Sequence, residues 1–292
     1  MEKRCISLST LPSGSYVLHF ADRSTYESDV VIGADGIKSV IRDFVTGRPV
    51  SLAYSNSVAY RSVVPSEAFK NVKMDMIRPL CWIGKDKHII SYPVQANQKM
   101  NLVVFSTNPT VPIGSVDVPL PWAKPVSQDE LLREFSQAEW GEDANTILKE
   151  MKNPSKWYLH FLHPPLSTYT RQRVVLVGDA AHAMLPYLGS GAGQGFEDVY
   201  ALCHLLGDVR AQKCHLDDAL KAYDSIRVAR ANMVQSLSTL MGDIVEKRGP
   251  GGGTIAQIRE QLRDIYHPIW HHDLKEEVER AVASVYGKRG VL

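Results

Sequence analysis

The first 50 residues alternate short apolar runs with polar turns. Residues 16–20 (YVLHF) alternate apolar and polar side chains, as a half-buried strand does, and residues 29–34 (DVVIGA) form an almost continuous apolar run. Asp35-Gly36 ends that second run, and apolar residues then recur at helical spacing over residues 37–45. The pattern predicts two strands joined by a polar turn, and then a tight turn and a helix.

The pattern of apolar and polar residues changes between about Pro49 and Pro165, where strand-like runs are broken by Pro, Gly and Asn. Two short helices interrupt these runs, and the first opens with Ser127 followed by Glu130, the spacing of a capping box. We therefore expect a mixed sheet with a helical edge. Its strands are predicted over residues 57–65, 81–94, 100–107 and 156–166, and its helices over residues 127–135 and 144–151.

The last third of the chain returns to strand and helix. A buried strand of parallel type precedes Gly178-Asp179, and a glycine-rich stretch leads into a helix that ends near Gly207. Residues 216–242 carry one broad apolar face, as a long amphipathic helix does, and two helices follow from about Thr254 and His272. The predicted fold is thus α/β, with an inserted sheet domain and C-terminal helices.

Composition narrows the class of protein. The 292 residues carry a formal net charge of +1, with Lys and Arg spread along the chain, so no nucleic-acid partner is predicted. No apolar run approaches the roughly 20 residues of a membrane helix. The four cysteines form no CxxC pair, which favours a reducing, cytoplasmic location; they are Cys5, Cys81, Cys203 and Cys214.

The stretch VVLVGDAAHAMLPYLGSGAGQGFED (174–198) has the features of a ligand loop. Asp179 would lie at the carboxyl end of a parallel strand, where open α/β sheets bind ligands. Small residues then precede a helix near Gln194, so free N–H groups would face a group that becomes anionic. Glycines there can also serve only close packing. A hydrolase reading from Ser190 and His182 is disfavoured, because the sequence lacks the GxSxG pattern.

The stretch VIGADGIKSVIR (31–42) repeats the logic of strand, turn and helix. Gly36 would supply the unusual backbone angle of a tight turn, and Ser39 and Arg42 lie one helical turn apart. Arg42 could reach a phosphate or the Asp35 carboxylate, or it could be an ordinary surface arginine. The histidines near residue 270 lack carboxylates at ligand spacing, so no metal site is predicted.

Together these two stretches resemble the DG and GD motifs of class A flavin-dependent aromatic hydroxylases. The stretches VAYRSVVP (58–65), HIISYPV (88–94) and IYHPIWHHDLKEEVERA (265–281) resemble the salicylate-hydroxylase-like branch, particularly its fungal members. The resemblance extends from about Tyr16 to the C-terminal region. It implies a glutathione-reductase-type domain that holds FAD, and reduction by NAD(P)H. Oxygen then gives a flavin C4a-hydroperoxide that hydroxylates a phenolic ring, in aromatic catabolism or secondary metabolism.

The resemblance also assigns cofactor residues. Asp179 would bind the ribityl chain of FAD, and Pro186 would lie beside the reactive edge of the isoalloxazine. Gly191 and Ala192 would offer N–H groups to the pyrimidine end, where reduced flavin is anionic. Asp35, with Arg42 beside it, would belong to the motif associated with the pyrophosphate and NAD(P)H.

The implied substrate residues are Arg61 and Tyr92, in two of the predicted strands. In the fungal phenol-oxidising members, an arginine and a tyrosine at about this spacing hold the substrate phenolate. A cation lowers the pKa of a phenol, and the phenolate is the better nucleophile. Arg61 could equally be a sheet-surface charge and Tyr92 a core aromatic. Trp82 and His88 could line the same pocket, although packing roles are favoured for both.

One departure from the family concerns the adenine half of FAD. The GxGxxG turn and the acidic residue that bind it in the family are absent from this sequence, and we expect the strands in VVIGADG (30–36) and VVLVGDA (174–180) to lack neighbours. The expected parts are residues 1–48 (a remnant of the FAD domain), 49–165 (substrate sheet), 166–248 (FAD domain) and 249–292 (C-terminal helices). Two hypotheses stay open: a monooxygenase that acts on a small phenol with O2, compatible with a homodimer, or a truncated, inactive fragment that cannot hold FAD alone.

Overall fold

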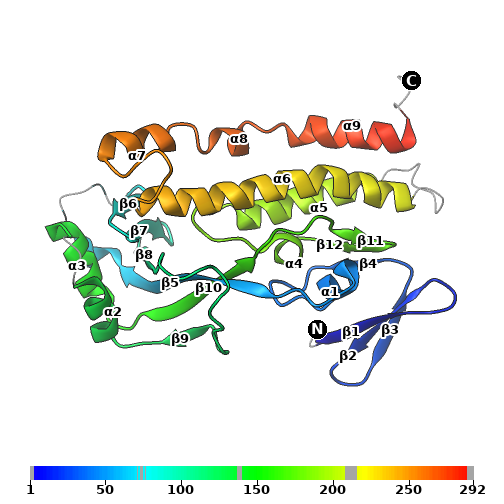
Figure 1. Cartoon of the computed structure of the whole chain (residues 1–292), viewed down its shortest axis with the longest axis horizontal. Coiled ribbons are helices and arrows are strands. Elements are labelled where there is room, and N and C mark those ends of the chain that lie inside the picture. The colour runs from blue at the N-terminus through cyan, green and yellow to red at the C-terminus, as the bar shows by residue number, and fades with distance from the viewer. Residues whose placement is uncertain are drawn as a thin grey trace. The chain divides into compact units, whose positions relative to one another are not determined.

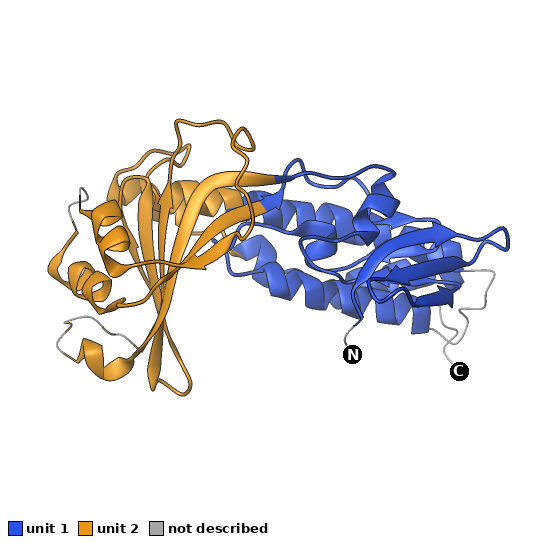
Figure 2. Cartoon of the chain, turned by 90° about the horizontal axis from the view of Figure 1, so that it is seen from below, with its two compact units in different colours: residues 1–52, 161–238, 267–292 blue, residues 53–160, 239–266 orange. Residues whose placement is uncertain are grey.

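The computed structural model describes residues 3–70, 72, 75, 77–136, 140–207 and 216–287. Cys214 lies outside these described residues. The chain divides into two compact units, coloured blue and orange in Figure 2. Unit 1 contains residues 1–52, 161–238 and 267–292, and unit 2 contains residues 53–160 and 239–266.

The central sheet of unit 1 has three strands in the order β11 (Thr170–Arg171), β12 (Val174–Leu176) and β4 (Val31–Gly33). β12 and β4 are parallel, with Leu176 opposite Gly33. A Cβ atom on Gly33 would lie 2.7 Å from the Ile41 side chain and 2.9 Å from that of Leu176, so only glycine fits there. Because the two strands end side by side, the DG and GD motifs lie at the same edge of the sheet.

The expectation that both motif strands lack neighbours is wrong for β12, which has β11 on one side and β4 on the other. β4 has only β12 beside it within the described part of the chain. The Ile32 side chain on β4 is 51% exposed, which leaves an apolar group at the edge of the sheet.

A separate antiparallel sheet precedes these strands, with β1 (Cys5–Thr10), β2 (Tyr16–Phe20) and β3 (Thr25–Ser28) in that order. β2 matches its prediction, but β1 and β3 were not predicted. Both are short and largely exposed: the apolar alternation of β1 extends only over Ile6 and Leu8, and β3 carries one apolar side chain, Tyr26. β4 covers only Val31–Gly33, so the buried strand is shorter than the predicted run 29–34.

The helices of unit 1 pack beside the parallel strands (Figure 1). α9 packs against α5, where the Tyr286 hydroxyl donates to the Leu205 carbonyl at 2.8 Å. The Tyr223 hydroxyl of α6 donates to the Leu176 carbonyl of β12 at 2.9 Å, which ties that helix to the sheet. The helices are α1 (Ile41–Thr46), α4 (Asp179–His182), α5 (Gly191–Gly207), α6 (Leu216–Val245, which ends in unit 2), α8 (His267–Trp270) and α9 (Leu274–Tyr286).

Unit 2 is a six-stranded sheet with helices on one face. The order is β6 (Leu80–Ile83), β7 (Lys87–Val94), β8 (Lys99–Thr107), β5 (Leu52–Pro65), β10 (Ser155–Leu162) and β9 (Ala123–Pro125). Side chains alternate across the sheet, so Ile89, Leu102 and Val104 share one face and pack with α2 (Gln128–Phe135) and α3 (Glu142–Glu150). Unit 2 also contains η1 (Ser66–Phe69) and α7 (Ile255–Leu262).

α2 begins after its predicted capping residue Ser127, and α7 begins at the predicted position near Thr254. The Ser127 hydroxyl accepts the Glu130 N–H at 3.2 Å, and Thr254 forms a complete capping box with Gln257. The α/β fold with an inserted sheet and C-terminal helices is confirmed. No helix in the described ranges is long and apolar enough to cross a membrane.

Candidate functional site

The GD motif makes a sharp turn at the end of β12. Gly178 has a φ of +60°, and its carbonyl accepts the N–H groups of Ala181 and His182 at 2.9 and 3.0 Å, which starts the short helix α4. Asp179 is exposed, and its carboxylate accepts no hydrogen bond from the residues that the structure describes. The turn therefore presents a carboxylate outward from the sheet edge.

The glycine-rich stretch places the N-terminus of α5 at the end of the same motif. The N–H of Gln194 bonds to the Ser190 carbonyl at 3.0 Å, so the helix begins with the N–H groups of residues 191–193 unpaired within it. A Cβ atom on Gly189 or Gly193 would meet nothing within 4 Å, and Ala192 is exposed. The space in front of these N–H groups is open, which is what a bound group needs.

A buried aspartate on α5 braces this turn. The Asp198 carboxylate is fully buried and accepts hydrogen bonds from the Gly178 N–H at 2.8 Å, His182 Nε2 at 2.6 Å and Arg227 Nε at 2.7 Å. Burial alone would raise the pKa of Asp198, but the hydrogen bond from His182 and the charge of Arg227 outweigh it, so the pKa lies below 3.8. Asp198 therefore stays ionised and fixes the backbone at the start of the turn.

A further ion-pair layer holds α5 to α6. Arg227 is fully buried, and its Nη1 lies 2.6 Å from Glu197 Oε2 while its Nη2 donates to Gln194 Oε1 at 2.8 Å. Arg230 contacts Glu197 at 3.0 Å and donates to the carbonyl of Pro268 at 2.6 Å. Burial opposes the charge of Arg227, but the two carboxylates raise the pKa of its guanidinium. The first turn of α5 is thereby rigidly placed.

The carboxylate of the DG motif accepts hydrogen bonds from backbone groups a few residues further along the chain. Asp35 Oδ2 accepts the N–H groups of Val40 and Ile41 at 2.8 and 3.3 Å, so it caps the N-terminus of α1. The helix begins at Ile41, four residues later than predicted, because the residues after Gly36 form the capped turn. The Ser39 hydroxyl accepts the Arg42 N–H at 2.9 Å, and so also serves the helix start.

Arg42 joins the two motifs from inside the protein. It is 2% exposed, and it donates from Nη1 to the Ala180 carbonyl at 3.1 Å and from Nη2 to the Ile37 carbonyl at 2.6 Å. The interpretation of Arg42 as a surface arginine is therefore wrong. Its buried Nε has no hydrogen-bond partner within the described ranges, and burial holds the pKa of the guanidinium below its usual value.

These residues fit the flavin half of FAD. The edge offers N–H groups at the start of a 17-residue helix, open space at three glycines and an outward carboxylate at Asp179. Helix N-termini stabilise negative charge, and an exposed carboxylate accepts hydrogen bonds from the hydroxyls of a sugar-like chain. Pro186 is exposed in the same stretch, where its carbonyl accepts the Gly189 N–H at 3.0 Å.

The predicted substrate residues lie on one face of the unit 2 sheet. Arg61 of β5 is opposite Val103 of β8, and Tyr92 of β7 is opposite Asn101 of β8, so both side chains project to the face away from α2 and α3. β8 separates the two strands, so Arg61 and Tyr92 are not direct neighbours. Arg61 is exposed and lies over the ring of Trp157 with 5.6 Å between its Cζ and the ring centroid.

His88 shares that face but is committed to a structural pair. It is 1% exposed, its Nδ1 lies 2.8 Å from Glu246 Oε1, and its ring stacks on Phe105 with 4.3 Å between centroids. Burial would raise the pKa of Glu246, but the His88 hydrogen bond and the Arg248 charge lower it overall. The favoured packing role for His88 agrees with this geometry.

The structure also bears on the hydrolase alternative. His182 pairs with Asp198 rather than with Asp179, and the Ser190 hydroxyl donates to the Leu188 carbonyl at 3.2 Å. Ser190 and His182 are thus engaged separately. Near the C-terminus, His272 pairs with Glu277 at 3.0 Å.

Sequence reasoning missed Asp198, Arg227 and Asn101. The first two carried a signal, since charged residues interrupt otherwise apolar faces of α5 and α6, but their partners lie 16 to 33 positions away. Asn101 is 7% exposed between two strands, and its Nδ2 has no hydrogen-bond partner in the described part of the chain. It lay inside an apolar strand pattern and gave no separate signal.

The fold and the parallel-strand edge define a ligand-binding α/β domain of the flavoprotein class with an inserted sheet. A model of a family described as "FAD binding domain" matches residues 16–238. The chain is 38% identical over 289 residues to a salicylate hydroxylase of Pseudomonas putida, covering 95% of this chain and 66% of that protein. It is 33% identical over 271 residues to an FAD-dependent monooxygenase of Aspergillus terreus, covering 88% and 61%.

The solved structure of a salicylate hydroxylase substrate complex superposes with a TM-score of 0.87 at 34% identity, over 99% of this chain and 71% of that one. The chain therefore belongs to the FAD-binding-domain family, among the class A FAD-dependent aromatic monooxygenases. It spans less than two thirds of the length of the curated relatives that it matches.

Proposed function

We propose that this chain carries the flavin loop and the substrate sheet of an FAD-dependent aromatic monooxygenase. The reaction would hydroxylate a phenolic or salicylate-like ring with NAD(P)H and O2. One observation carries this proposal: parallel strands β4 and β12 bring both motifs to the edge at which the N-terminus of α5 is open. FAD, when bound, supplies the redox chemistry that activates oxygen for transfer to an aromatic ring.

The cofactor residues act by binding and by electrostatics. Asp179 would accept hydrogen bonds from the ribityl hydroxyls, and the N–H groups of Gly191 and Ala192 would stabilise negative charge at the pyrimidine end. Pro186 would lie beside the reactive edge of the ring system. Asp35 and Arg42 would support the pyrophosphate side, mainly by holding the DG turn, because both already bond to backbone groups.

The substrate residues would act on the phenol itself. The Arg61 guanidinium would lower the pKa of a bound phenol, which favours the more nucleophilic phenolate. The Tyr92 hydroxyl would fix the position of the phenolic oxygen. Asn101 lies opposite Tyr92 in the sheet, and its unpaired Nδ2 is a further donor on this face.

The test is flavin binding followed by turnover. The purified chain is titrated with FAD, and quenching of flavin fluorescence and retained yellow colour after gel filtration are measured. NAD(P)H oxidation is then followed with and without salicylate or a simple phenol. We expect flavin near stoichiometry and oxidation that the aromatic compound stimulates.

Variants separate the two halves of the proposal. Asp179→Asn is expected to weaken FAD binding, whereas Arg61→Gln is expected to leave FAD binding intact and to reduce the stimulation by substrate. A folded chain that takes up no FAD would contradict the proposal and favour the alternative of an inactive fragment. If Arg61→Gln and Tyr92→Phe turn over like the parent protein, the assignment of the substrate residues is wrong.

A further inference from the structure

We propose that a cavity in unit 2, on the helix-covered side of its sheet, is a second binding site for a small aromatic carboxylate. The cavity has a volume of about 940 Å³, within the size range of ligand pockets. Val58 of β5 and Ser106 of β8 line it, and they project to the face opposite that of Arg61 and Tyr92. The site is therefore distinct from the proposed substrate face and needs no flavin.

Aromatic side chains form one wall of the cavity. The rings of Tyr54 and Tyr158 meet edge to face with 5.9 Å between centroids, and Trp140 also lines the space. A Cβ atom on Gly84 would lie 2.8 Å from the Trp140 ring, so the glycine lets the indole pack closely there. Such a wall favours an aromatic ligand, because offset and edge-to-face contacts between rings are favourable. Burial raises the pKa of Tyr54 to about 12, so its hydroxyl stays neutral at ordinary pH.

The charges that line the cavity are mainly positive. Four lysines contribute, against two carboxylates; they are Lys85, Lys87, Lys156 and Lys247, with Asp86 and Glu134. Both carboxylates are already paired, since Glu134 lies 3.1 Å from Lys87 Nζ and Asp86 lies 3.1 Å from Arg248 Nη1. A ligand carboxylate would therefore meet excess positive charge.

The lysines of the cavity differ in the ion pairs that they form. Lys156 Nζ lies 2.9 Å from Glu130 Oε1 and over the rings of Tyr60 and Tyr158 at 5.4 Å each, so it belongs to the cavity wall. Lys247 is exposed and forms no ion pair with a carboxylate of the described residues. We therefore assign the anion-binding role to Lys247, at the rim.

Two polar atoms of the lining residues lack hydrogen-bond partners among the residues that the structure describes. Asn56 is 6% exposed, and its Nδ2 donates to the Val111 carbonyl at 2.7 Å while its Oδ1 is unpaired. The Nε1 of Trp140 is also buried without a partner. Buried polar groups are usually hydrogen-bonded, so these residues of the lining leave one acceptor and one donor unsatisfied within the described part of the chain. A ring that carries a carboxylate and a hydroxyl has the complementary groups.

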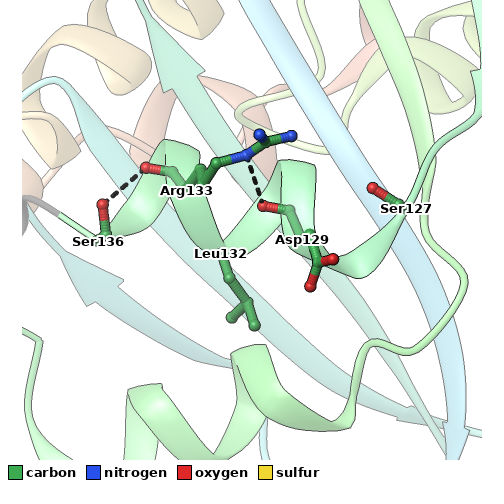
Figure 3. Close-up of a pocket in the computed structure, with 5 residues that line it drawn as sticks. All are labelled: Ser127, Asp129, Leu132, Arg133 and Ser136. Atoms are coloured by element: carbon green, nitrogen blue, oxygen red, sulfur yellow. Dashed lines mark hydrogen bonds between the residues drawn. The ribbon is translucent and has the colours of Figure 1, made fainter.

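The depression along α2 offers a contrast (Figure 3). It has a volume of about 500 Å³ and is lined by Ser127, Asp129, Leu132, Arg133 and Ser136. Its polar groups bond within the helix, since Arg133 Nε donates to the Asp129 carbonyl and the Ser136 hydroxyl donates to the Arg133 carbonyl. It has neither an aromatic wall nor an excess of cations, so we assign it no ligand.

The first experiment titrates benzoate into the full chain by calorimetry. Thr110→Trp fills the cavity from an exposed loop residue and should weaken the affinity for benzoate by about tenfold or more. Ser115→Trp, in the same loop but outside the lining, should bind like the parent protein. Phenol should bind at least about tenfold more weakly than benzoate, and inorganic phosphate should not displace benzoate.

Three results would overturn the inference. Thr110→Trp could bind benzoate like the parent protein, or phosphate could compete fully, which would indicate a plain anion site. Arg61→Gln could abolish the binding, which would place benzoate on the substrate face instead. Loss of FAD binding or of turnover leaves this inference untouched, so its failure and that of the proposed function are distinguishable.

A second measurement needs no substitution. Acetylation of lysines is followed by mass spectrometry with and without benzoate at about four times its Kd, where labelling of a protected amine slows about fivefold. Lys247 should be protected, and Lys275, which is 74% exposed on α9, should not. Equal labelling of Lys247 with and without benzoate contradicts the proposal, whether or not the variants fold.

Discussion

The DG and GD turns use the same two residue types in opposite ways. In the DG turn, the Asp35 carboxylate bonds back to two N–H groups at the start of α1. In the GD turn, Asp179 is exposed and accepts no hydrogen bond from a described residue, and the bond to the turn comes from Asp198 on α5 instead. The DG turn is held by its own aspartate, and the GD turn is held by an aspartate of another helix.

The difference follows from the order of the two residues. Where aspartate comes before glycine, its side chain lies ahead of the next helix and caps it. Where glycine comes first, with a φ of +60°, aspartate is already the first residue of α4 and points away from the helix axis. A buried acid is then needed to hold the glycine N–H. The arrangement leaves Asp179 available for a ligand.

The largest effect is expected from replacing Asp198, the buried aspartate of α5 that holds the GD turn. Asp198→Asn removes the charge that faces the buried Arg227 and His182, so His182 loses its carboxylate partner and Arg227 keeps only Glu197. Loss of one partner of a buried charge pair costs about 3–5 kcal/mol. We expect the free energy of unfolding, measured by urea titration and circular dichroism, to fall by that amount.

Asp218→Asn is the matched control for this prediction. Asp218 lies on α6 and pairs with Lys221 at 3.2 Å on the surface, so its replacement should change the free energy of unfolding by less than about 0.5 kcal/mol. A similar loss for both variants would mean that Asp198 is not a brace.

The next effect separates stability from cofactor binding. Asp179→Asn should leave the free energy of unfolding within about 0.5 kcal/mol, because no described residue bonds to this carboxylate. FAD affinity should fall by about 1.5–3 kcal/mol, the value of a hydrogen bond to a charged group. Flavin fluorescence titration checks this, with Asp218→Asn as control. An unchanged affinity would remove Asp179 from the cofactor site.

Part of this comparison could be predicted from sequence and part could not. The two motif strands and the end of α5 near Gly207 follow from apolar runs and glycines that are local in the sequence, but the pairing of the two strands with each other was not predicted. Asp198 and Arg227 bond across 29 positions, and no periodic pattern encodes such a pair. β1 and β3 escaped prediction for a different reason, because both are short and largely exposed, and the apolar alternation of β1 extends only over Ile6 and Leu8.

A smaller effect is expected in the DG turn, which is held by its own Asp35. Asp35→Ala removes the cap of α1, which should lower the free energy of unfolding by about 1 kcal/mol. Asp35→Asn keeps an acceptor at the same place and should retain most of that stability. The measurement is again urea unfolding. Equal losses for the alanine and asparagine variants would show that charge, not capping, is what Asp35 contributes.

The smallest effect is a difference in pH dependence between the buried Asp198 and the half-buried Asp224. Asp198 has a folded pKa below its ordinary 3.8, because the hydrogen bond from His182 and the charge of Arg227 outweigh burial. The contribution of ionised Asp198 to the free energy of unfolding is complete above the ordinary pKa of 3.8 and is lost as the pH falls through the folded pKa. The difference in free energy of unfolding between the parent protein and Asp198→Asn should therefore narrow in acid.

Asp224 provides the opposite sign within the same unit. Burial raises the pKa of Asp224 above 3.8, although bonds from Tyr169 and Thr168 oppose the shift. The folded state then binds the proton more readily, so the parent protein should gain stability relative to Asp224→Asn as the pH falls from neutral through that raised pKa. Urea unfolding of the three proteins between about pH 3 and 7 measures both differences. If both differences in the free energy of unfolding change in the same direction as the pH falls, the buried network around Asp198 is not what keeps its carboxylate ionised. The contacts of Asp198 would then not explain how the GD turn is held.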